Sequence, residues 1–335
     1  MTRTVPEPMY GRKHIYLASF NTSHGLLLLI GLLLAALLSA CAGTGTAPTE
    51  ISGHMKISGS TALKPLAEEG ARQFRKLHPQ ANIEVVGNGS INGLKDVMAG
   101  KSNIGDSDIY ADFASYPDPN MTDHIVCVIP FTMIVNPDVP VNSLTKEQII
   151  QIFSTGQITN WREVGGPDLT ITPVVRPETS GTRDTFRKYI LGGRDENTGS
   201  RKLLKTDSSD TVVATVAETP GAIGYLAASV LKPTVHPIAI DNVTPTRDNI
   251  VSGHYTFWSY EHMYTLGDDN TMVSSYLDFM LTQLMQQKAQ QLGYIPIAVM
   301  KLPTAHWSGG EQRDSAASLA VLKEREDTRH ESYYK

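Results

Sequence analysis

Cysteine is nearly absent from this chain, whose 335 residues contain only Cys41 and Cys127. Cys127 lies inside the apolar stretch 124–131 and has no partner for an internal disulfide, so we expect a buried structural thiol. A disulfide framework is thereby excluded, and the fold must be stabilised by its core. The roughly 290 residues after the N-terminal segment are enough for such a core, arranged as two lobes.

An excess of positive charge is also missing. The formal net charge is −5, and Arg3, Glu7, Arg12 and Lys13 give residues 1–40 a net +2, so the remaining chain carries −7. Such an acidic chain is a poor candidate for binding nucleic acid. Any anion that it captures must be held by local groups, because no global positive field is available.

Several catalytic and metal-binding patterns are absent. The ten histidines show no ligand spacing, and His254 and His262 are too far apart for one helix face. Neither a Gly-x-Ser-x-Gly elbow nor a Gly-Lys-Ser/Thr phosphate loop occurs. We therefore expect no catalytic residue, no metal and no cofactor. Trp161 is expected to be a core anchor and not a stacking platform.

The N-terminus has the pattern of an export signal. A basic opening precedes the apolar run Gly25–Leu38, which is shorter than the roughly 18–20 residues that span a bilayer. The run ends in Leu38-Ser39-Ala40-Cys41, which resembles the bacterial lipobox and implies lipidation of Cys41. Residues 1–40 are thus expected to be a lipoprotein signal peptide and 41–54 a flexible tether. A simple cleaved signal and an uncut helix are the alternatives.

Strand-like and helix-like stretches alternate along the rest of the chain, which predicts an α/β fold with two mixed, mainly parallel sheets flanked by helices. Apolar spacing predicts one long helix over Met272–Leu292. Residues 303–335 are charged and poorly periodic, and are expected to form a mobile tail.

Four short segments rich in Gly, Ser or Thr follow predicted strands, and three of them precede helices. They are Ser58–Thr61, Gly87–Ser90, Gly105–Asp108 and Pro177–Thr182. Helix starts offer unpaired N–H groups and a partial positive charge, while hydroxyls add donors and glycines allow close approach. Ordinary N-capping explains any one of them. Their repetition favours an oxyanion site that includes Ser60, Thr61, Ser90, Ser180, Gly181 and Thr182.

Arg176 precedes Ser180 by four residues and ends a predicted strand. Its guanidinium can grip a tetrahedral oxyanion through two parallel hydrogen bonds. Glu178 is expected to pair with Arg176 and hold it in place. A surface salt bridge is the alternative role of Arg176.

A carboxylate in the Gly105–Asp108 segment indicates the kind of anion. Phosphate near neutral pH carries a proton and sulfate carries none, so an acceptor-only carboxylate favours phosphate. Asp108 is our choice for this role. Asp106 is expected to be a solvated neighbour, with a second acceptor as the alternative.

The motifs SGST, VGNGSINGLKD, NIGDSD, RPETSGTRDTF and TPGAIGYL occur in the order typical of one family. With them, residues 55–302 resemble the phosphate-binding proteins of phosphate-specific ABC transporters, the PstS family. Phe257–Tyr260 departs from the Arg-Pro-containing stretch that is usual in this family, at the return to the first lobe.

The resemblance implies a type II periplasmic-binding-protein fold with a hinge between its lobes. Lobe 1 comprises 55–130 and 227–302, lobe 2 comprises 131–226, and the linking strands lie near Ile129–Val135 and Ile223–Leu226. The implied ligand groups are Thr61, the Ala62 N–H, Ser90, Asp108, Arg176, Ser180, Gly181 and Thr182.

The expected function is capture of inorganic phosphate and its delivery to the permease subunits of an ABC transporter. The carrier is expected to be a monomer without enzymatic activity, lipid-anchored on the extracytoplasmic face of the cell membrane. A surface sensor or adhesin that uses the same fold for another oxyanion or a phosphorylated ligand is the alternative. Phosphatase activity lacks a general base or a metal set.

Overall fold

The computed structural model describes residues 50–112, 114–196, 204–206, 208–267 and 270–300. The predicted signal peptide, Cys41 and the predicted tail lie outside the described residues. Among the helices that are described, none is both long enough and apolar enough to cross a membrane.

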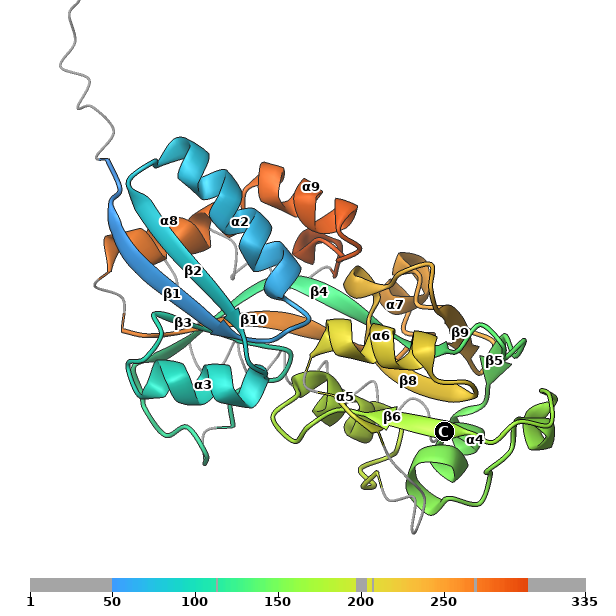
Figure 1. Ribbon diagram of the computed structural model, residues 1–335. Coiled ribbons are helices and arrows are strands. Elements are labelled where there is room, and N and C mark those ends of the chain that lie inside the picture. The colour runs from blue at the N-terminus through green and yellow to red at the C-terminus, as the bar shows by residue number, and fades with distance from the viewer. Residues whose placement is uncertain (1–49, 113, 197–203, 207, 268–269, 301–335) are drawn as a thin grey trace, which may run out of the picture. The chain divides into compact units, whose positions relative to one another are not determined.

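The first sheet is built around parallel strands with β10 inserted from the C-terminal part of the chain (Figure 1). Its strands in spatial order are β2 (Ala81–Gly87), β1 (Gly53–Gly59), β3 (Ile104–Ser107), β10 (Trp258–Leu266) and β4 (Met121–Val135). β1 is parallel to β2 and β3, and β10 is antiparallel to β3 and β4. The flanking helices are α2 (Lys64–Leu77), α3 (Ser90–Met98), α8 (Thr271–Met280) and α9 (Gln283–Gln291). Figure 1 shows α2, α8 and α9 on one side of the strands and α3 on the other.

The second sheet continues from the end of β4. Its other strands are β8 (Ala222–Ala227), β6 (Thr172–Val175), β7 (Leu204–Lys205), β9 (His236–Ile240) and β5 (Ser143–Leu144). The helical segments around it are α4 (Lys146–Ile150), η1 (Gln151–Thr155), η2 (Trp161–Val164), α5 (Gly181–Tyr189), α6 (Ser209–Glu218), η3 (Ala228–Val230) and α7 (Arg247–Val251). A last short helix, η4 (Ile297–Met300), follows α9. Parallel and antiparallel pairs occur in both sheets, which confirms the predicted α/β class with mixed sheets.

One continuous strand, β4, belongs to both sheets. It pairs with β10 from Met121 to Pro130 and with β8 from Phe131 to Val135. The predicted link at Ile129–Val135 therefore lies within a buried strand. The predicted second link at Ile223–Leu226 lies on β8, which pairs with β4 and β6 in the described part of the chain, and it stays a prediction.

The chain returns from the second sheet to the first just before β10. Phe131 donates its N–H to the carbonyl of Phe257 at 3.0 Å, immediately ahead of the first residue of β10. β9, which precedes this point in the chain, pairs with Met133–Val135 of β4 and with β5. The lobe boundaries remain a prediction, and this pairing favours a return near Phe257 over one near residue 227.

The predicted long helix over Met272–Leu292 is interrupted. α8 ends at Met280, and Thr282 adopts an extended backbone conformation. Its hydroxyl accepts a hydrogen bond from the N–H of Met285 at 3.4 Å. Threonine competes for backbone hydrogen bonds in this way and favours helix starts over helix interiors. The break is therefore an N-cap that apolar periodicity alone did not reveal.

An aromatic cluster fills the core beneath α5. Phe186 stacks on Tyr225 with ring centroids 4.1 Å apart, and Phe153 and Phe257 pack against the same two rings. Trp161 is fully buried and donates its indole N–H to the carbonyl of Gly221 at 2.9 Å, which confirms its expected role as a core anchor. Cys127 is buried and free, as expected.

Candidate oxyanion site

The first polar segment joins β1 to α2 and is folded around the hydroxyl of Ser60. That oxygen accepts from the N–H groups of Ala62 and Leu63, both at 3.0 Å, and donates to Asp108 Oδ1. The Ala62 N–H, implied as a ligand donor, thus points at Ser60 in this state. Gly59 has φ +139°, and a Cβ there would collide with the backbone of Asp106, so only glycine lets β1 and β3 approach this closely.

The second segment joins β2 to α3. Ser90 is the first residue of α3 and is buried, and its hydroxyl accepts from the N–H of Asp108 at 3.0 Å. The next residue, Ile91, donates its N–H to the carbonyl of Thr179 at 3.1 Å. The start of α3 therefore contacts both the end of β3 and the segment before α5.

The third segment carries Asp108 just after β3. Its carboxylate is buried and accepts from two hydroxyls, Ser60 at Oδ1 and Thr182 at Oδ2, the latter at 2.8 Å. Asp106 is also buried, which makes its expected solvated role wrong: it lies inside β3, close enough to Tyr276 of α8 for its charge to act on that side chain. Burial and the charge of Asp108 raise the pKa of Asp106 well above its ordinary value.

The fourth segment runs from β6 into α5. Ser180 is the N-cap of α5, and its hydroxyl accepts from the N–H of Arg183 at 3.3 Å. A Cβ on Gly181 would meet Asp108 Cβ and Ser90 Cβ at 2.9 Å, so the absence of a side chain lets α5 reach the ends of β3 and α3. Thr182 then donates to Asp108 from the first turn of the helix.

Arg176 is 2% exposed although it carries a permanent charge. Its guanidinium donates to the hydroxyl of Thr61 at 3.0 Å and to that of Ser209 at 3.3 Å. Thr61 Oγ1 and Ser209 Oγ lie 3.1 Å apart. Burial lowers the pKa of Arg183, but the hydrogen bond and charge of Glu196 outweigh it, and exposed Glu178 adds a smaller rise. The expected pairing of Glu178 with Arg176 stays a prediction.

Ser209 is a member of this cluster that the sequence reasoning missed. It is buried at the first turn of α6, directly after the N-cap Ser208. The signal was present, since Ser208-Ser209-Asp210 precedes a valine-rich helix in the same manner as the other polar segments.

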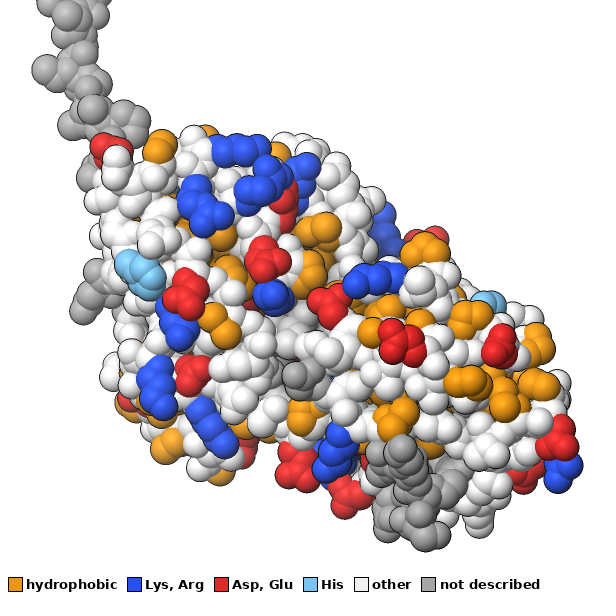
Figure 2. Space-filling model, viewed as in Figure 1, with side chains coloured by type: hydrophobic (Ala, Val, Ile, Leu, Met, Phe, Trp, Pro, Cys, Tyr) orange, Lys and Arg blue, Asp and Glu red, His pale blue; other side chains and the backbone are white. Residues whose placement is uncertain are grey.

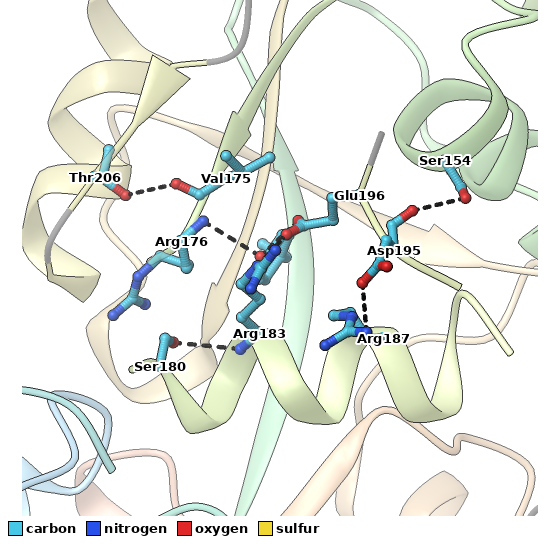
Figure 3. A network of polar contacts seen from close by, with 10 residues as sticks. Ser154, Val175, Arg176, Ser180, Arg183, Arg187, Asp195, Glu196 and Thr206 are labelled. Atoms are coloured by element: carbon cyan, nitrogen blue, oxygen red, sulfur yellow. Dashed lines mark hydrogen bonds and ion pairs between the residues drawn. The ribbon is translucent and has the colours of Figure 1, made fainter. Parts of the chain in front are cut away.

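A second polar network supports Arg176 from behind (Figure 3). The N–H of Arg176 donates to Tyr225 Oη at 3.3 Å, and Tyr225 donates to Glu196 Oε1 at 2.7 Å. Arg183 completes the network through Glu196 Oε2 at 2.5 Å. Burial raises the pKa of Glu196, while the bonds from Tyr225 and Arg183 oppose that rise. In Figure 3 the Arg176 guanidinium points away from this network. The network therefore fixes the backbone of Arg176, and its guanidinium stays available to the site.

The face shown in Figure 2 carries both signs of charge, with Lys and Arg side chains interspersed with Asp and Glu. Arg176 and the helix starts are positive groups within the site itself, as expected for a chain of negative net charge. Among the described residues, no group of three or more His, Cys, Asp or Glu side chains is arranged to hold a metal ion.

The structure thus brings together most of the residues that the sequence singled out. Hydrogen bonds or close contacts join Ser60, Thr61, Ser90, Asp108, Arg176, Gly181 and Thr182. Ser180 adjoins them as the cap of α5, and Ala62 as the residue that Ser60 caps. Buried hydroxyls, one guanidinium and one carboxylate can bind a protonated tetrahedral oxyanion.

Comparison with known proteins places this arrangement in a family. The model of the PBP superfamily domain matches residues 44–283. The phosphate-binding protein PstS of Bacillus subtilis is 41% identical over 254 residues, which cover 75% of this chain and 83% of that protein. PstS of Borreliella burgdorferi is 23% identical, over 72% of this chain and 90% of that protein.

Two solved structures share the fold. One is a candidate phosphate ABC transporter substrate-binding protein from Clostridium perfringens with bound phosphate. It has a TM-score of 0.69 and 28% identity, covering 73% of this chain and 100% of that chain. The other is an ABC-type phosphate transport receptor from Vibrio cholerae, with a TM-score of 0.59 and 25% identity, covering 72% of this chain and 99% of that chain.

Proposed function

The chain belongs to the PstS family of phosphate-binding proteins within the PBP superfamily, and we propose that it captures inorganic phosphate and delivers it to an ABC permease. Membership also confirms the predicted type II periplasmic-binding-protein fold class. Two buried groups carry the proposal. The Arg176 guanidinium donates to the hydroxyls of Thr61 and Ser209, and the Asp108 carboxylate accepts from those of Ser60, the neighbour of Thr61, and Thr182.

Phosphate oxygens would take the place of the protein acceptors that these donors now use. Arg176 would turn its two N–H groups from Thr61 and Ser209 to the ligand, and both hydroxyls would follow. Hydrogen bonds to charged groups contribute roughly 1.5–3 kcal/mol each, so several reach the about −8 kcal/mol of a micromolar site. The groups proposed to contact phosphate are Ser60, Thr61, Ala62, Ser90, Asp108, Arg176, Ser180, Gly181, Thr182 and Ser209.

Asp108 supplies selectivity in this proposal. Its carboxylate accepts a hydrogen bond from the P–OH group, whereas a fully ionised sulfate offers no proton and is repelled. A site that leaves a buried polar group unpaired with the wrong ligand discriminates by about 10⁴-fold or more.

The two ends of the site lie on segments assigned to different lobes. Thr61, Ser90 and Asp108 belong to the proposed lobe 1, and Arg176 and Thr182 to the proposed lobe 2. Closure of the lobes around phosphate would assemble the site, and opening would release the ion to the permease. The contacts from Thr182 to Asp108 and from Arg176 to Thr61 support this division.

The location proposed for the carrier is the extracytoplasmic face of the cell membrane. The apolar run ending in Leu38-Ser39-Ala40-Cys41 supports a cleaved signal and a lipid on Cys41. We propose a monomeric, non-catalytic carrier, because one chain holds both halves of the site.

Calorimetric titration of the purified protein with phosphate and with sulfate tests the function. We expect a single site that binds phosphate at micromolar concentration or below and binds sulfate at least about 10⁴-fold more weakly. An absence of binding heat with phosphate, or equal binding of both anions, would overturn the proposal.

A further inference from the structure

Glu261 lies beside Asp108 although no local sequence pattern connects them. In the antiparallel pair of β10 and β3, His262 is opposite Ser107 and Met263 is opposite Asp106. One step beyond the end of β3 the same register sets Glu261 opposite Asp108, whose charge acts on Glu261. Residues opposite each other on neighbouring strands project to the same face of a sheet. The carboxyl group of Glu261 therefore shares a face with those of Asp106 and Asp108.

This carboxyl group is fully buried. The residue is 0% exposed, and neither of its oxygens has a hydrogen-bond partner of ordinary geometry among the described residues. An ionised carboxylate in such a place would lose its hydration without compensation, which costs far more than keeping its proton.

Within the described part of the chain, the titratable groups whose charges act on Glu261 include no cation. They are Asp106 and Asp108 from β3 and its end, Cys127 from β4, and Tyr294 from the segment after α9, with Tyr276 of α8 beside Asp106. His262, its neighbour in sequence, alternates to the other face, where it contacts Asp123 at 2.9 Å. Burial, followed by the charges of Asp108 and Asp106, raises the pKa of Glu261 well above its ordinary value.

Asp108 has room for such a donor. A carboxylate has about four acceptor positions, and Ser60 and Thr182 use one on each oxygen. One of the two remaining acceptor positions of Asp108 suits the P–OH group of the ligand. The other suits a neutral carboxylic acid on the side of Asp108 away from the ligand. Ser259, two residues before Glu261, holds the Asp108 backbone in place by donating its hydroxyl to the Asp108 carbonyl.

We propose that Glu261 is a positioning residue of the phosphate site, whose neutral carboxyl group donates a hydrogen bond to Asp108 and holds that carboxylate as an acceptor aimed at the ligand. The inference rests on the proposed function. The proton stays on Glu261, so Glu261 and Asp108 together carry one negative charge and not two. A second charge here would repel phosphate and would favour a protonated Asp108, which could then donate to sulfate.

Three variants of the full chain test this role. Glu261→Gln keeps a neutral side chain with a donor, Glu261→Met keeps the volume without a donor, and Asp106→Asn alters the other buried acid. Infrared difference spectra at neutral pH should show the carbonyl stretch of a protonated carboxylic acid, part of which disappears in Glu261→Gln. Phosphate affinity by calorimetry should fall about tenfold or more in Glu261→Met and stay within about threefold in Glu261→Gln and Asp106→Asn.

Rescue by glutamine together with loss of the band supports the inference. An unchanged band in Glu261→Gln overturns it, and so does wild-type affinity in Glu261→Met or equal weakening by both substitutions. Should Glu261→Met fail to fold, the spectrum and the affinity of Glu261→Gln still decide. If the wild-type protein binds no phosphate, the proposed function fails. If the wild type binds phosphate and the Glu261 variants bind it equally well, only the role of Glu261 fails.

Discussion

Thr182 at the start of α5 donates its hydroxyl hydrogen bond to Asp108 Oδ2 at 2.8 Å, across 74 residues of sequence. The same carboxylate accepts from Ser60 at its other oxygen. A helix start rich in donors thus faces a buried acceptor, and this combination separates a site for a protonated oxyanion from a general anion site.

Replacement of Asp108 by Asn should change selectivity more than affinity. The amide still accepts through its oxygen but also donates, so a fully ionised anion no longer meets a repulsive charge. We expect phosphate to bind up to about tenfold more weakly and the preference for phosphate over sulfate to fall by at least about 100-fold. Calorimetric titration with both anions measures the ratio. Exposed Asp138→Asn is the control, and an unchanged ratio in Asp108→Asn would show that Asp108 is not the proton acceptor.

Arg176→Lys should weaken phosphate binding although the positive charge is kept. The two donors of Arg176 reach two different oxygens, Thr61 Oγ1 and Ser209 Oγ, in a geometry that a single ammonium group does not reproduce. Loss of one or two charge-assisted bonds predicts about 100-fold weaker binding. Arg162→Lys is a matched control, because the Arg162 side chain is 66% exposed and pairs with the exposed Asp168. Equal affinities of the two variants would contradict a bidentate role for Arg176.

The fold class and the polar segments could be predicted because their signals are local. A strand, a Gly/Ser/Thr turn and a helix start are contiguous in sequence, so Ser60, Ser90 and Thr182 were found without a structure. The carboxyl ends of parallel strands meet at one edge, which brings such segments together.

The rest depends on neighbours that are distant in sequence. Glu261 meets Asp108 only through the register of β10 and β3, and Arg183 meets Glu196 only after α5 and the segment that follows it have folded. The burial of Asp106 was missed because aspartate is usually solvated, and only the pairing of β3 between β1 and β10 places it in the interior. The helix break at Thr282 was missed because no glycine or proline marks it.

Gly181→Ala should weaken binding while leaving the fold intact. A Cβ at this position would meet Ser90 and Asp108 at distances that real Cβ atoms avoid, so α5 would be held away from β3. Gly181 does not have a positive φ, and alanine there should not destabilise α5. We expect about tenfold to 100-fold weaker phosphate binding by calorimetry and a melting temperature within a few degrees of the wild type, measured without phosphate. Wild-type affinity in Gly181→Ala would mean that the approach of α5 to β3 is not needed for binding.

The raised pKa of Glu261 predicts how stability depends on pH. Because the folded protein holds a proton that the unfolded chain releases above its ordinary pKa of 4.5, the contribution of Glu261 to stability is fully present below that pH. It is lost progressively as the pH rises toward the folded pKa, by about 1.4 kcal/mol per pH unit. Glu261→Gln has no proton to lose, so its free energy of unfolding should rise relative to the wild type as the pH increases.

Urea unfolding of both proteins at about pH 5, 7 and 9, without phosphate, measures this difference. The difference in the free energy of unfolding between Glu261→Gln and the wild type should be smallest at the lowest pH. It should grow as the pH rises, until the pH passes the pKa of Glu261 in the folded protein. Asp138→Asn, which replaces an exposed carboxyl group, should follow the wild-type curve at every pH. Asp106→Asn should behave like Glu261→Gln, because the pKa of Asp106 is raised by the same burial and by the charge of Asp108. Parallel curves for Glu261→Gln and the wild type would mean that Glu261 gains no proton on folding, and a neutral donor behind Asp108 would then be ruled out.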